Sequence, residues 1–218
     1  ELAETNVGID YGFLNNRITG SINYFDKKSS DLLADIAVPD GANLRNQGFF
    51  NIGSVRTKGV EFSIESDIVK TDDLTWNVAF NTTYIDQKIT ELGITVPGFQ
   101  GYLAGDNIAG GNGNKVQINS VGFTPNSFLV YEQLYDAEKR PIQGAYVDRN
   151  EDGKIDTADR YRYQKPAADY TFGLFSTLNY KKFDFTMNWR ASLGNYIFDN
   201  VSSNLGYSDA GLRRQTDL

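Results

Sequence analysis

The feature that most constrains how this chain can fold is a strict alternation of apolar and polar residues along several long stretches. In the stretch 5–14, every second residue from Val7 to Phe13 is apolar or aromatic. Successive side chains of an extended strand point to opposite faces, so this alternation predicts a β-strand with two chemically different faces. The stretch 17–27 alternates in the same way after Asn15-Asn16. Asparagine tolerates the positive φ of a two-residue turn, so the two stretches predict a β-hairpin.

Two further hairpins follow the same pattern. Their turns lie at Lys70–Asp73 and at Lys181-Lys182. Their strands are the stretches 60–67, 74–84, 170–180 and 183–193.

The connections between the hairpins are long, and they cover residues 28–54 and about 86–167. The closing stretch 194–218 is expected to be a loop. The apolar run 128–135 lies inside the second connection, and we interpret it as a short excursion of β-structure. If it were a full strand, the turn at Lys181-Lys182 would fall at the wrong end of the strands.

All short connections fall at one end of the predicted strands and all long connections at the other. This arrangement predicts an all-β fold of antiparallel up-and-down strands. Transmembrane β-barrels have short periplasmic turns at one end of their strands and long extracellular loops at the other. A soluble β-sandwich also alternates, but its connections need not sort by length, and the connection 86–167 is hard to accommodate in a compact domain. The face expected to meet lipid carries alternate residues of the first and last strands, namely Val7, Ile9, Tyr11, Phe13, Phe183, Phe185, Met187 and Trp189.

The composition excludes several classes of function. The net charge of −7 argues against nucleic acid or an anionic membrane surface as a partner. The chain contains neither Cys nor His, which excludes disulfides and thiolate catalysis and removes most catalytic triads and transition-metal sites. No run of about 18 apolar residues is present, so no transmembrane helix is expected.

No catalytic site is predicted. Glu61, Glu65 and Asp67 share one strand face, with neighbours about 7 Å apart, and this separation suits an inverting glycosidase. A water-facing barrel wall is polar in any case, and nothing in the sequence marks a raised pKa. The glycine-rich stretch 105–113 lacks the Gly-Lys-Ser/Thr ending of a phosphate-binding loop.

The acidic stretch Asp148–Asp159 matches the calcium-loop pattern D-x-[DN]-x-[DN]-G with an acidic twelfth residue. Gly153 permits the sharp bend, and Ca²⁺ favours six to eight oxygen ligands. The twelfth residue is Asp159, where an EF-hand has Glu, as in dockerin-type calcium loops. The expected ligands are the side chains of Asp148, Asn150, Asp152, Asp156 and Asp159 and the backbone carbonyl of Lys154.

The alternative is a surface turn without an ion, in which Asp and Asn side chains accept hydrogen bonds from their own backbone. No helical pattern flanks the stretch, so a bound Ca²⁺ would stabilise a loop rather than act as a sensor.

Aromatic residues of the long connections have two readings as well. Flat apolar rings suit contact with sugar rings or with a partner protein, and they also suit packing of a loop against itself. These residues are Phe49, Phe50, Phe99, Tyr102, Phe123, Phe128, Tyr131, Tyr146 and Tyr161.

Three stretches together resemble one family. They are residues 6–17, residues 55–61, and residues 146–161 with the continuation Tyr170-Thr171-Phe172-Gly173. The combination is similar to the SusC/RagA family of TonB-dependent outer-membrane transporters of Bacteroidetes, and the resemblance covers nearly the whole chain.

The resemblance implies that residues 1–218 are a portion, from the C-terminal half, of a 22-stranded barrel in the cell outer membrane. It implies a SusD-like surface lipoprotein as partner, an oligosaccharide or peptide as substrate, and contact with TonB through a plug domain that this chain lacks. The alternative function is a soluble, calcium-stabilised β-domain for glycan binding or adhesion.

Overall fold

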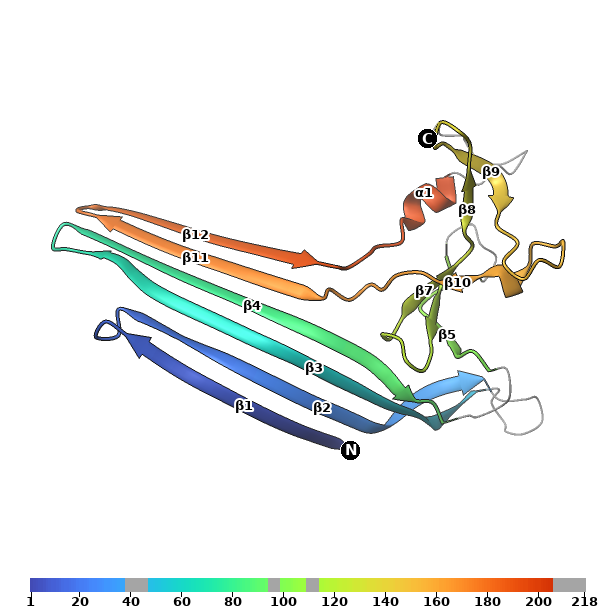
Figure 1. Ribbon diagram of the computed structural model, residues 1–218, viewed down its shortest axis with the longest axis horizontal. Helices are drawn as coiled ribbons and strands as arrows, with labels where there is room; N and C mark the ends of the chain where they lie inside the picture. The colour runs from blue at the N-terminus through green and yellow to red at the C-terminus, as the bar shows by residue number, and fades with distance from the viewer. Residues whose placement is uncertain (38–46, 94–98, 109–113, 206–218) are drawn as a thin grey trace. The chain divides into compact units, whose positions relative to one another are not determined.

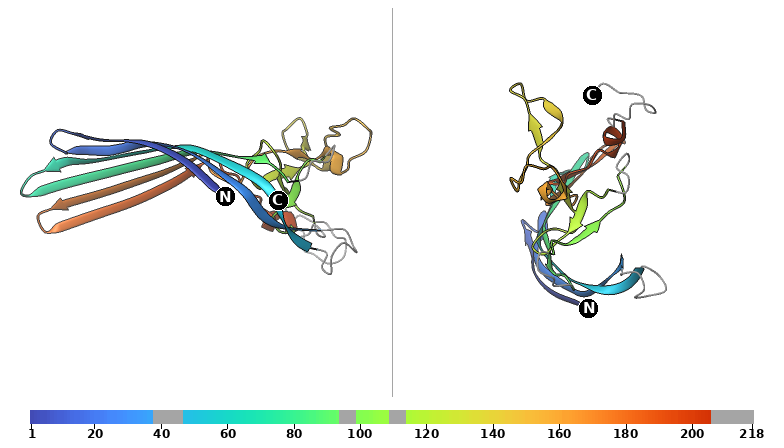
Figure 2. Two further views of the ribbon diagram at one scale, coloured as in Figure 1. Left: turned by 90° about the horizontal axis from the view of Figure 1, so that it is seen from below. Right: turned by 90° about the vertical axis from the view of Figure 1, so that its right-hand side faces the viewer.

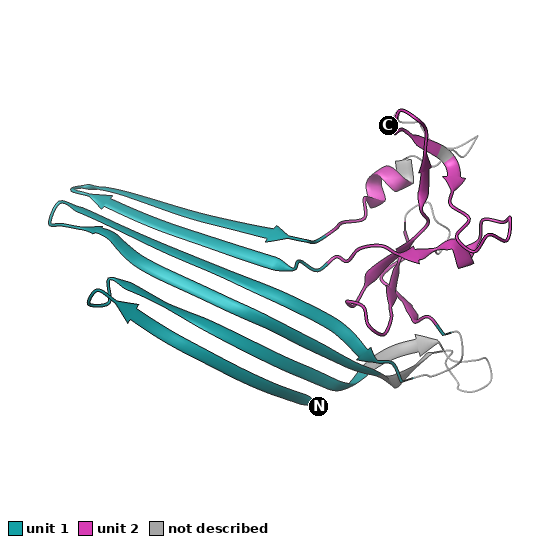
Figure 3. Cartoon of the chain, viewed as in Figure 1, with its two compact units in different colours: residues 1–99, 167–195 teal, residues 100–166, 196–218 magenta. Residues whose placement is uncertain are grey.

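The computed structural model describes residues 1–37, 47–93, 99–108 and 114–205. The chain divides into two compact units, one of residues 1–99 with 167–195 and one of residues 100–166 with 196–218 (Figure 3). The first unit is a six-stranded antiparallel sheet, and Figures 1 and 2 show that its long strands are twisted and that the sheet is curved.

The strands of this sheet lie side by side in the order of the chain. Because β4 pairs directly with β11, with Tyr84 opposite Tyr170, everything between these two strands is an insertion between sheet neighbours. The up-and-down topology predicted from the sequence is thereby confirmed. The strands are β1 (Leu2–Phe13), β2 (Ile18–Ala37), β3 (Gln47–Lys70), β4 (Leu74–Glu91), β11 (Tyr170–Tyr180) and β12 (Phe183–Leu193).

The apolar run 128–135 takes no part in this sheet. It contributes β7 (Ser127–Val130) and β8 (Gln133–Tyr135), which belong to two separate small sheets of the second unit. The interpretation of this run as an excursion within a connection is therefore confirmed.

The three short turns differ from one another in detail. Tyr180 lies opposite Phe183, so the predicted two-residue turn at Lys181-Lys182 is confirmed. The two-residue turn predicted at Asn15-Asn16 is wrong, because Phe13 lies opposite Ile18 and leaves residues 14–17 in the turn. Leu14, Asn15 and Asn16 all have positive φ, between 53° and 62°. The guanidinium of the next residue, Arg17, donates to the carbonyls of Asp67 and Ile68 at 2.8 and 2.6 Å, so it anchors the turn to β3.

Three strands extend beyond their predicted ends. β2 continues to Ala37 and β3 begins at Gln47, inside the connection predicted for 28–54, and β4 continues to Glu91 rather than ending near Tyr84. In β4 the charged residues Asp86 and Lys88 follow Tyr84 on the same face although pairing stays regular, so the apolar pattern ends before the strand does. In β2 and β3 a register shift between Ser29 and Leu32 interrupts the alternation. A residue inserted in one strand moves the side chains that follow it to the opposite faces. A test for strict alternation therefore fails to detect the strand beyond that point.

Pairing places the apolar residues of all six strands on one face. The row through Val7, Tyr24, Val60, Tyr84, Tyr170 and Leu193 lies near one end of this apolar face, and the row through Tyr11, Gly20, Ile64, Phe80, Leu174 and Trp189 lies near its middle. Many of these side chains are exposed, among them Ile9 at 67% and Phe183 at 77%. An apolar face this large needs a cover, and the hydrocarbon of a bilayer provides one.

Two aromatic side chains on the apolar face satisfy their polar groups with hydrogen bonds. The indole of Trp76 donates to the hydroxyl of Ser176 at 3.0 Å, and the Tyr11 hydroxyl donates to the Ser63 carbonyl at 2.9 Å. Tyr11 reaches β3 by lying over Gly20, where a Cβ would come within 2.4 Å of the Tyr11 hydroxyl. Unpaired polar groups are costly in hydrocarbon, so these contacts suit a lipid-facing surface.

The second unit is built from short elements. The strands β5 (Tyr102–Ala104), β6 (Gln117–Asn119), β7 and β10 (Tyr161–Arg162) form one sheet, in the order β10-β7-β6-β5. β8 and β9 (Pro141–Tyr146) form a second sheet, and the 3-10 helix η1 (Thr157–Asp159) follows the acidic loop. The buried core of the unit includes Ile118, Phe128 and Leu129.

The loop predicted for residues 194–218 is wrong in part, because it contains the helix α1 (Asn200–Leu205). Asp199 precedes this helix and accepts hydrogen bonds from the backbone N–H groups of Val201 and Ser202 at 3.1 and 3.0 Å. This capping satisfies N–H groups that the first helical turn leaves unpaired. Among the described residues, no helix combines the length and the apolar character needed to cross a membrane.

We expect arginine to be tolerated on one face of the sheet and not on the other. Phe80 belongs to the middle row of the apolar face, and the preceding residue Ala79 projects from the opposite face, between Glu65 and Phe175. Phe80→Arg should destabilise the complete protein in lipid vesicles by about 2–4 kcal/mol, the cost of arginine at the bilayer midplane. Ala79→Arg is the matched control and should change stability little. Urea unfolding of both variants measures the difference, and equal stability would contradict a lipid-facing assignment of the Phe80 face.

Candidate functional site

The acidic loop Asp148–Asp159 begins with a tight turn. The Asp148 carboxylate accepts from the Gly153 N–H at 2.7 Å, the Asn150 side-chain oxygen accepts from the Asp152 N–H at 3.2 Å, and the Asp152 carboxylate accepts from the Lys154 N–H at 2.9 Å. Gly153 has a φ of 80°, which a residue without a Cβ adopts readily. The structure therefore brings together the first three predicted side-chain ligands.

Asp159, the twelfth residue, closes the loop through hydrogen bonds. Its side chain is fully buried, and its two carboxylate oxygens accept from the N–H groups of Arg149 and Asp156, each at 2.8 Å. Asp156 in turn accepts from the Ala158 N–H at 2.7 Å and caps η1. Hydrogen bonds from backbone N–H groups, first that of Asp156, lower the pKa of Asp159 and keep its carboxylate charged.

The donor set of this loop suits Ca²⁺ in chemistry, because every side chain concerned offers oxygen. Within the described part of the chain, which includes the whole acidic loop, no group of three or more acidic side chains is arranged so that it could hold a metal ion. The carboxylates of Asp148, Asp152 and Asp159 instead accept from backbone N–H groups. The assignment of Ca²⁺ to this loop stays a prediction.

Contacts around Arg149 fix the acidic loop to its neighbours. The Arg149 guanidinium lies 4.5 Å from the centre of the Tyr161 ring and pairs with the Glu132 carboxylate. The Val147 N–H donates to the Glu132 carbonyl at 2.9 Å. The loop is thereby attached to β10 and to the start of β8.

Most of the loop aromatics pack within the second unit. Phe128 is buried, the rings of Tyr131 and Tyr146 are 5.3 Å apart, and the Arg162 guanidinium lies 4.9 Å from the centre of the Phe123 ring. Burial raises the pKa of Tyr102. The side chains of Phe49 and Phe50 lie outside the described residues. For the packed rings, the structure favours the reading in which the loop packs against itself.

Two of the three acidic residues of β3, Glu65 and Asp67, belong to a hydrogen-bonded network on the polar face of the sheet. The side-chain amide of Asn77 donates to Glu65 at 3.0 Å and to Asp67 at 3.1 Å. One amide shared between two carboxylates links β3 to β4, so the closeness of these two carboxylates has a structural explanation.

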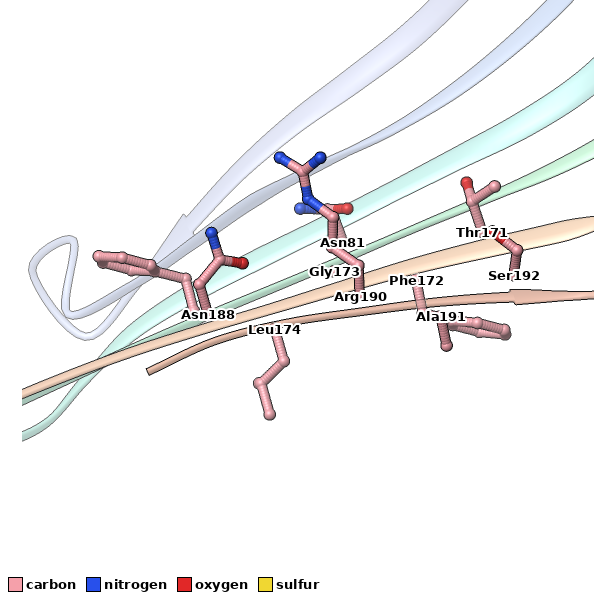
Figure 4. Close-up of a pocket in the computed structure, with 10 residues that line it drawn as sticks. Asn81, Thr171, Phe172, Gly173, Leu174, Asn188, Arg190, Ala191 and Ser192 are labelled. Carbon is pink, nitrogen blue, oxygen red and sulfur yellow. The ribbon is translucent and has the colours of Figure 1, made fainter. Parts of the chain in front are cut away.

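The polar face also carries a hollow of about 540 Å³ beside the end of the sheet, to which Asn81, Asn188 and Arg190 contribute (Figure 4). Arg190, Gly173 and Asn81 lie opposite one another on β12, β11 and β4. The Asn81 amide lies over Gly173, where a Cβ would be only 2.8 Å from its oxygen. In Figure 4 these polar side chains point to one side of the sheet and Leu174 to the other. The alternation of the stretch 183–193 places Arg190 on the polar face, but the sequence alone does not show that Arg190 lies near Asn81, because the inserted residues separate them.

Comparison with known proteins identifies the fold family. The sequence model described as TonB dependent receptor-like, beta-barrel, matches residues 4–194. The chain belongs to this family. TonB-dependent receptors of this kind are outer-membrane β-barrel proteins that act in transport and are not enzymes, which confirms the predicted location, the all-β barrel fold and the expected lack of a catalytic role.

Individual relatives agree with this assignment. The chain is 44% identical over 208 residues to the TonB-dependent receptor SusC of Bacteroides thetaiotaomicron, covering 95% of this chain and 21% of SusC. It is 30% identical over 202 residues to the TonB-dependent receptor P26 of Formosa agariphila, covering 88% of this chain and 20% of P26. The chain therefore spans about a fifth of the length of these relatives, and the resemblance noted from its motifs is confirmed.

Solved structures show the same fold. The RagAB peptide transporter matches with a TM-score of 0.68 at 20% identity, over 88% of this chain and 21% of the other. The RagAB peptide importer in its open-open state matches with a TM-score of 0.69 at 20% identity, over 89% of this chain and 20% of the other.

We expect Asp159→Asn to loosen the acidic loop. The amide side chain keeps one oxygen and loses the negative charge, so it cannot accept equally well from both the Arg149 and the Asp156 N–H groups. Hydrogen exchange of the peptide that contains these two amides, followed in the complete receptor at neutral pH, should accelerate on the order of tenfold. Glu151→Gln, an exposed change in the same turn, is the control and should leave exchange unaltered.

We expect the acidic loop of the wild type to lose its protection against hydrogen exchange when the pH becomes strongly acidic. The pKa of Asp159 in the folded loop is below its ordinary value of 3.8, so its stabilising contribution is complete above that value and is lost as the pH falls through the folded-state pKa. Protection that disappeared well above pH 3.8 would contradict this account.

Proposed function

We propose that this chain forms part of the barrel wall, with an inserted external unit, of a TonB-dependent transporter that imports oligosaccharides or peptides together with a SusD-like surface lipoprotein. The observation that carries the proposal is membership of the receptor family combined with a sheet that is apolar on one face across six strands. The lumen side of such a wall is polar, and here it carries side chains such as Asn77, Asn81 and Arg190.

The placement of the connections supports an orientation in the membrane. The turns after β1, β3 and β11 are short, whereas the insertion between β4 and β11 contains all the small strands of the second unit. In barrels of this kind the short turns lie in the periplasm and the long loops outside the cell. The second unit is then available to a surface lipoprotein and to the incoming substrate.

The relatives support the class of substrate. The solved structures that share the fold are described as a peptide transporter and a peptide importer. The resemblance of the motifs to the SusC/RagA family supports oligosaccharides as the second proposed class of substrate. Contact with TonB would be made by the plug domain of the complete receptor.

Ca²⁺ in the acidic loop is a second part of the proposal. It is supported by the calcium-type spacing of Asp148, Asn150 and Asp152, which share one turn, and by the proximity of the fully buried Asp159, which joins the loop ends. Asp156 and the Lys154 carbonyl would complete the oxygen ligands. The ion would add order to an external loop, since no helix pair is present among the described residues for it to open or close.

The alternative of a soluble, calcium-stabilised module for glycan binding or adhesion loses its support. It leaves the exposed apolar rows of the six-stranded sheet without a cover, whereas the family is one of outer-membrane barrels.

The transport proposal is tested in cells that lack the complete receptor and in cells that carry it. Labelled oligosaccharides and labelled peptides are offered separately, and the label that reaches the cell interior is measured. We expect one of the two classes to enter only when the receptor is present, and a SusD-like lipoprotein to copurify with it. Receptor-independent entry of both classes, or a receptor that purifies alone, would overturn the corresponding part of the proposal.

The calcium proposal is tested by calorimetric titration of the complete receptor. We expect a dissociation constant of about 10⁻⁴–10⁻³ M, typical of extracellular calcium modules, and no binding heat in the Asp148→Ala/Asp152→Ala variant. Glu138→Ala removes an exposed carboxylate from another turn of the same unit and should bind Ca²⁺ as the wild type does. Equal heats for the wild type and the double variant would leave the turn without an ion as the correct reading.

A further inference from the structure

The apolar face of the six-stranded sheet continues into charged residues at only one end. The row that contains Tyr24, Val60 and Tyr84 is followed, two residues along each strand, by Asp26, Lys58 and Asp86, and after two more residues by Lys28, Arg56 and Lys88. Pairing is regular through all three rows, and alternate residues of a strand share a face. The charged side chains therefore project from the same face as the lipid-facing aromatics, and we name these six residues the charged belt.

At the opposite end of the same face, within the described residues, the strands end on apolar rows, and Lys181, whose ammonium lies 5.5 Å from the centre of the Tyr180 ring, belongs to the turn. There the last row pairs Leu74 with Tyr180 and Tyr180 with Phe183. The charged belt lies toward the end of the strands from which the second unit is inserted, because Ile85 donates its N–H to the Asp169 carbonyl beside it. The two ends of the apolar face are thus chemically different.

The charged belt carries an excess of positive charge. It contains four cations and two carboxylates, in a chain whose net charge is −7. Asp26 is held by Arg56 through two hydrogen bonds, of which that from Nε is 2.8 Å, and Lys58 lies 3.9 Å from it. Lys88 pairs with Asp86 at 3.1 Å. Among the described residues no ion pair is recorded for Lys28, which is exposed.

The sheet is hollowed next to Lys28. A depression of about 540 Å³ is lined by Lys28, Arg56 and Asp26 together with the hydroxyl-bearing Thr5 and Thr90. Glu4 also lines the depression, and its carboxylate pairs with Lys27 at 3.2 Å, so its charge is partly compensated. Ammonium, guanidinium and hydroxyl groups around one depression are donors that suit a phosphate group.

We infer that the charged belt binds the phosphate of a lipid headgroup in the membrane leaflet on the side of the inserted unit. The inference rests on the proposed function for the orientation of the barrel. Tyrosines of membrane barrels mark the headgroup level, and cations immediately beyond them attract anionic headgroups. Acyl chains of the same lipid would lie along the apolar rows below the belt.

The net charge of −7 had argued against an anionic membrane surface as a partner. Salt screens charges that lie more than about 8 Å apart, so the local excess in the belt, rather than the charge of the whole chain, sets the attraction for a headgroup. For this face, the inference departs from the expectation drawn from net charge.

The test uses the complete receptor, purified in detergent, and native mass spectrometry that counts bound lipids. The probes are a phosphorylated outer-membrane glycolipid and the same glycolipid after removal of its phosphates. The test variant is Lys28→Gln/Lys88→Gln. The matched control is Lys181→Gln/Lys182→Gln, which removes two lysines from the turn at the opposite end of the strands.

We expect the wild type and the control to prefer the phosphorylated glycolipid, and the test variant to bind it roughly 30-fold more weakly, since each lysine near an anionic surface contributes about fivefold. The preference should shrink as salt is added. Equal binding of the two glycolipids by the wild type, or equal losses in the test and control variants, would overturn the inference. Displacement of the glycolipid by millimolar inorganic phosphate would overturn it too, because the belt would then be a site for free anions.

Two further measurements separate this outcome from the function itself. Heat-modifiable migration on a gel shows whether each variant forms a folded barrel, and uptake of labelled substrate shows whether it transports. A receptor that folds and transports, but binds the glycolipid equally well without its phosphates, would contradict the inference about the charged belt. The proposed function would not be affected by that result.

Discussion

The register of the six-stranded sheet is the constraint on which the rest of the structure depends. Tyr84 opposite Tyr170 and Phe62 opposite Ile22 keep most of the apolar side chains of the sheet on one face. A shift by one residue in any pair would move a whole strand's apolar set to the polar side. Cross-strand contacts outside the backbone ladder resist such a shift: Tyr11 reaches over Gly20 to β3, Arg17 holds the carbonyls of Asp67 and Ile68, and Trp76 binds Ser176.

The six strands and their order could be predicted from alternation because a strand with one lipid face and one water face has the simplest pattern in protein sequence. The prediction failed where that pattern is interrupted locally. Asp31, with a φ of 56°, lies at the register shift in β2, and the regular alternation is interrupted there. The turn at residues 14–17 was misread because two adjacent asparagines suit a two-residue turn, whereas Leu14 also adopts a positive φ. Helix α1 had a readable signal in Asp199, which was overlooked within a stretch that lacks periodicity.

In the acidic loop, the spacing of the acidic residues along the sequence predicts part of the local structure but not all of it. The pattern correctly places Asp148, Asn150 and Asp152 on one turn. It does not reveal that Asp159 binds the Arg149 and Asp156 amides, because a carboxylate at the twelfth position can join the two ends of a loop through an ion or through N–H groups. The two arrangements need the same residue types, and only the direction of the side chain distinguishes them.

Because β4 pairs directly with β11, the barrel wall and the inserted unit are constrained separately, although one chain forms both. Ile85 donates its N–H to the Asp169 carbonyl at 2.9 Å, so the wall is continuous on either side of the insertion. The wall must keep its register, its apolar face and the charged belt, all of which depend on the alternation within the strands. The inserted unit contributes no strand to the wall, and its core of Ile118, Phe128 and Leu129 belongs to itself. Changes in the surface of the inserted unit can therefore arise without disturbing the pairing that holds the six strands together.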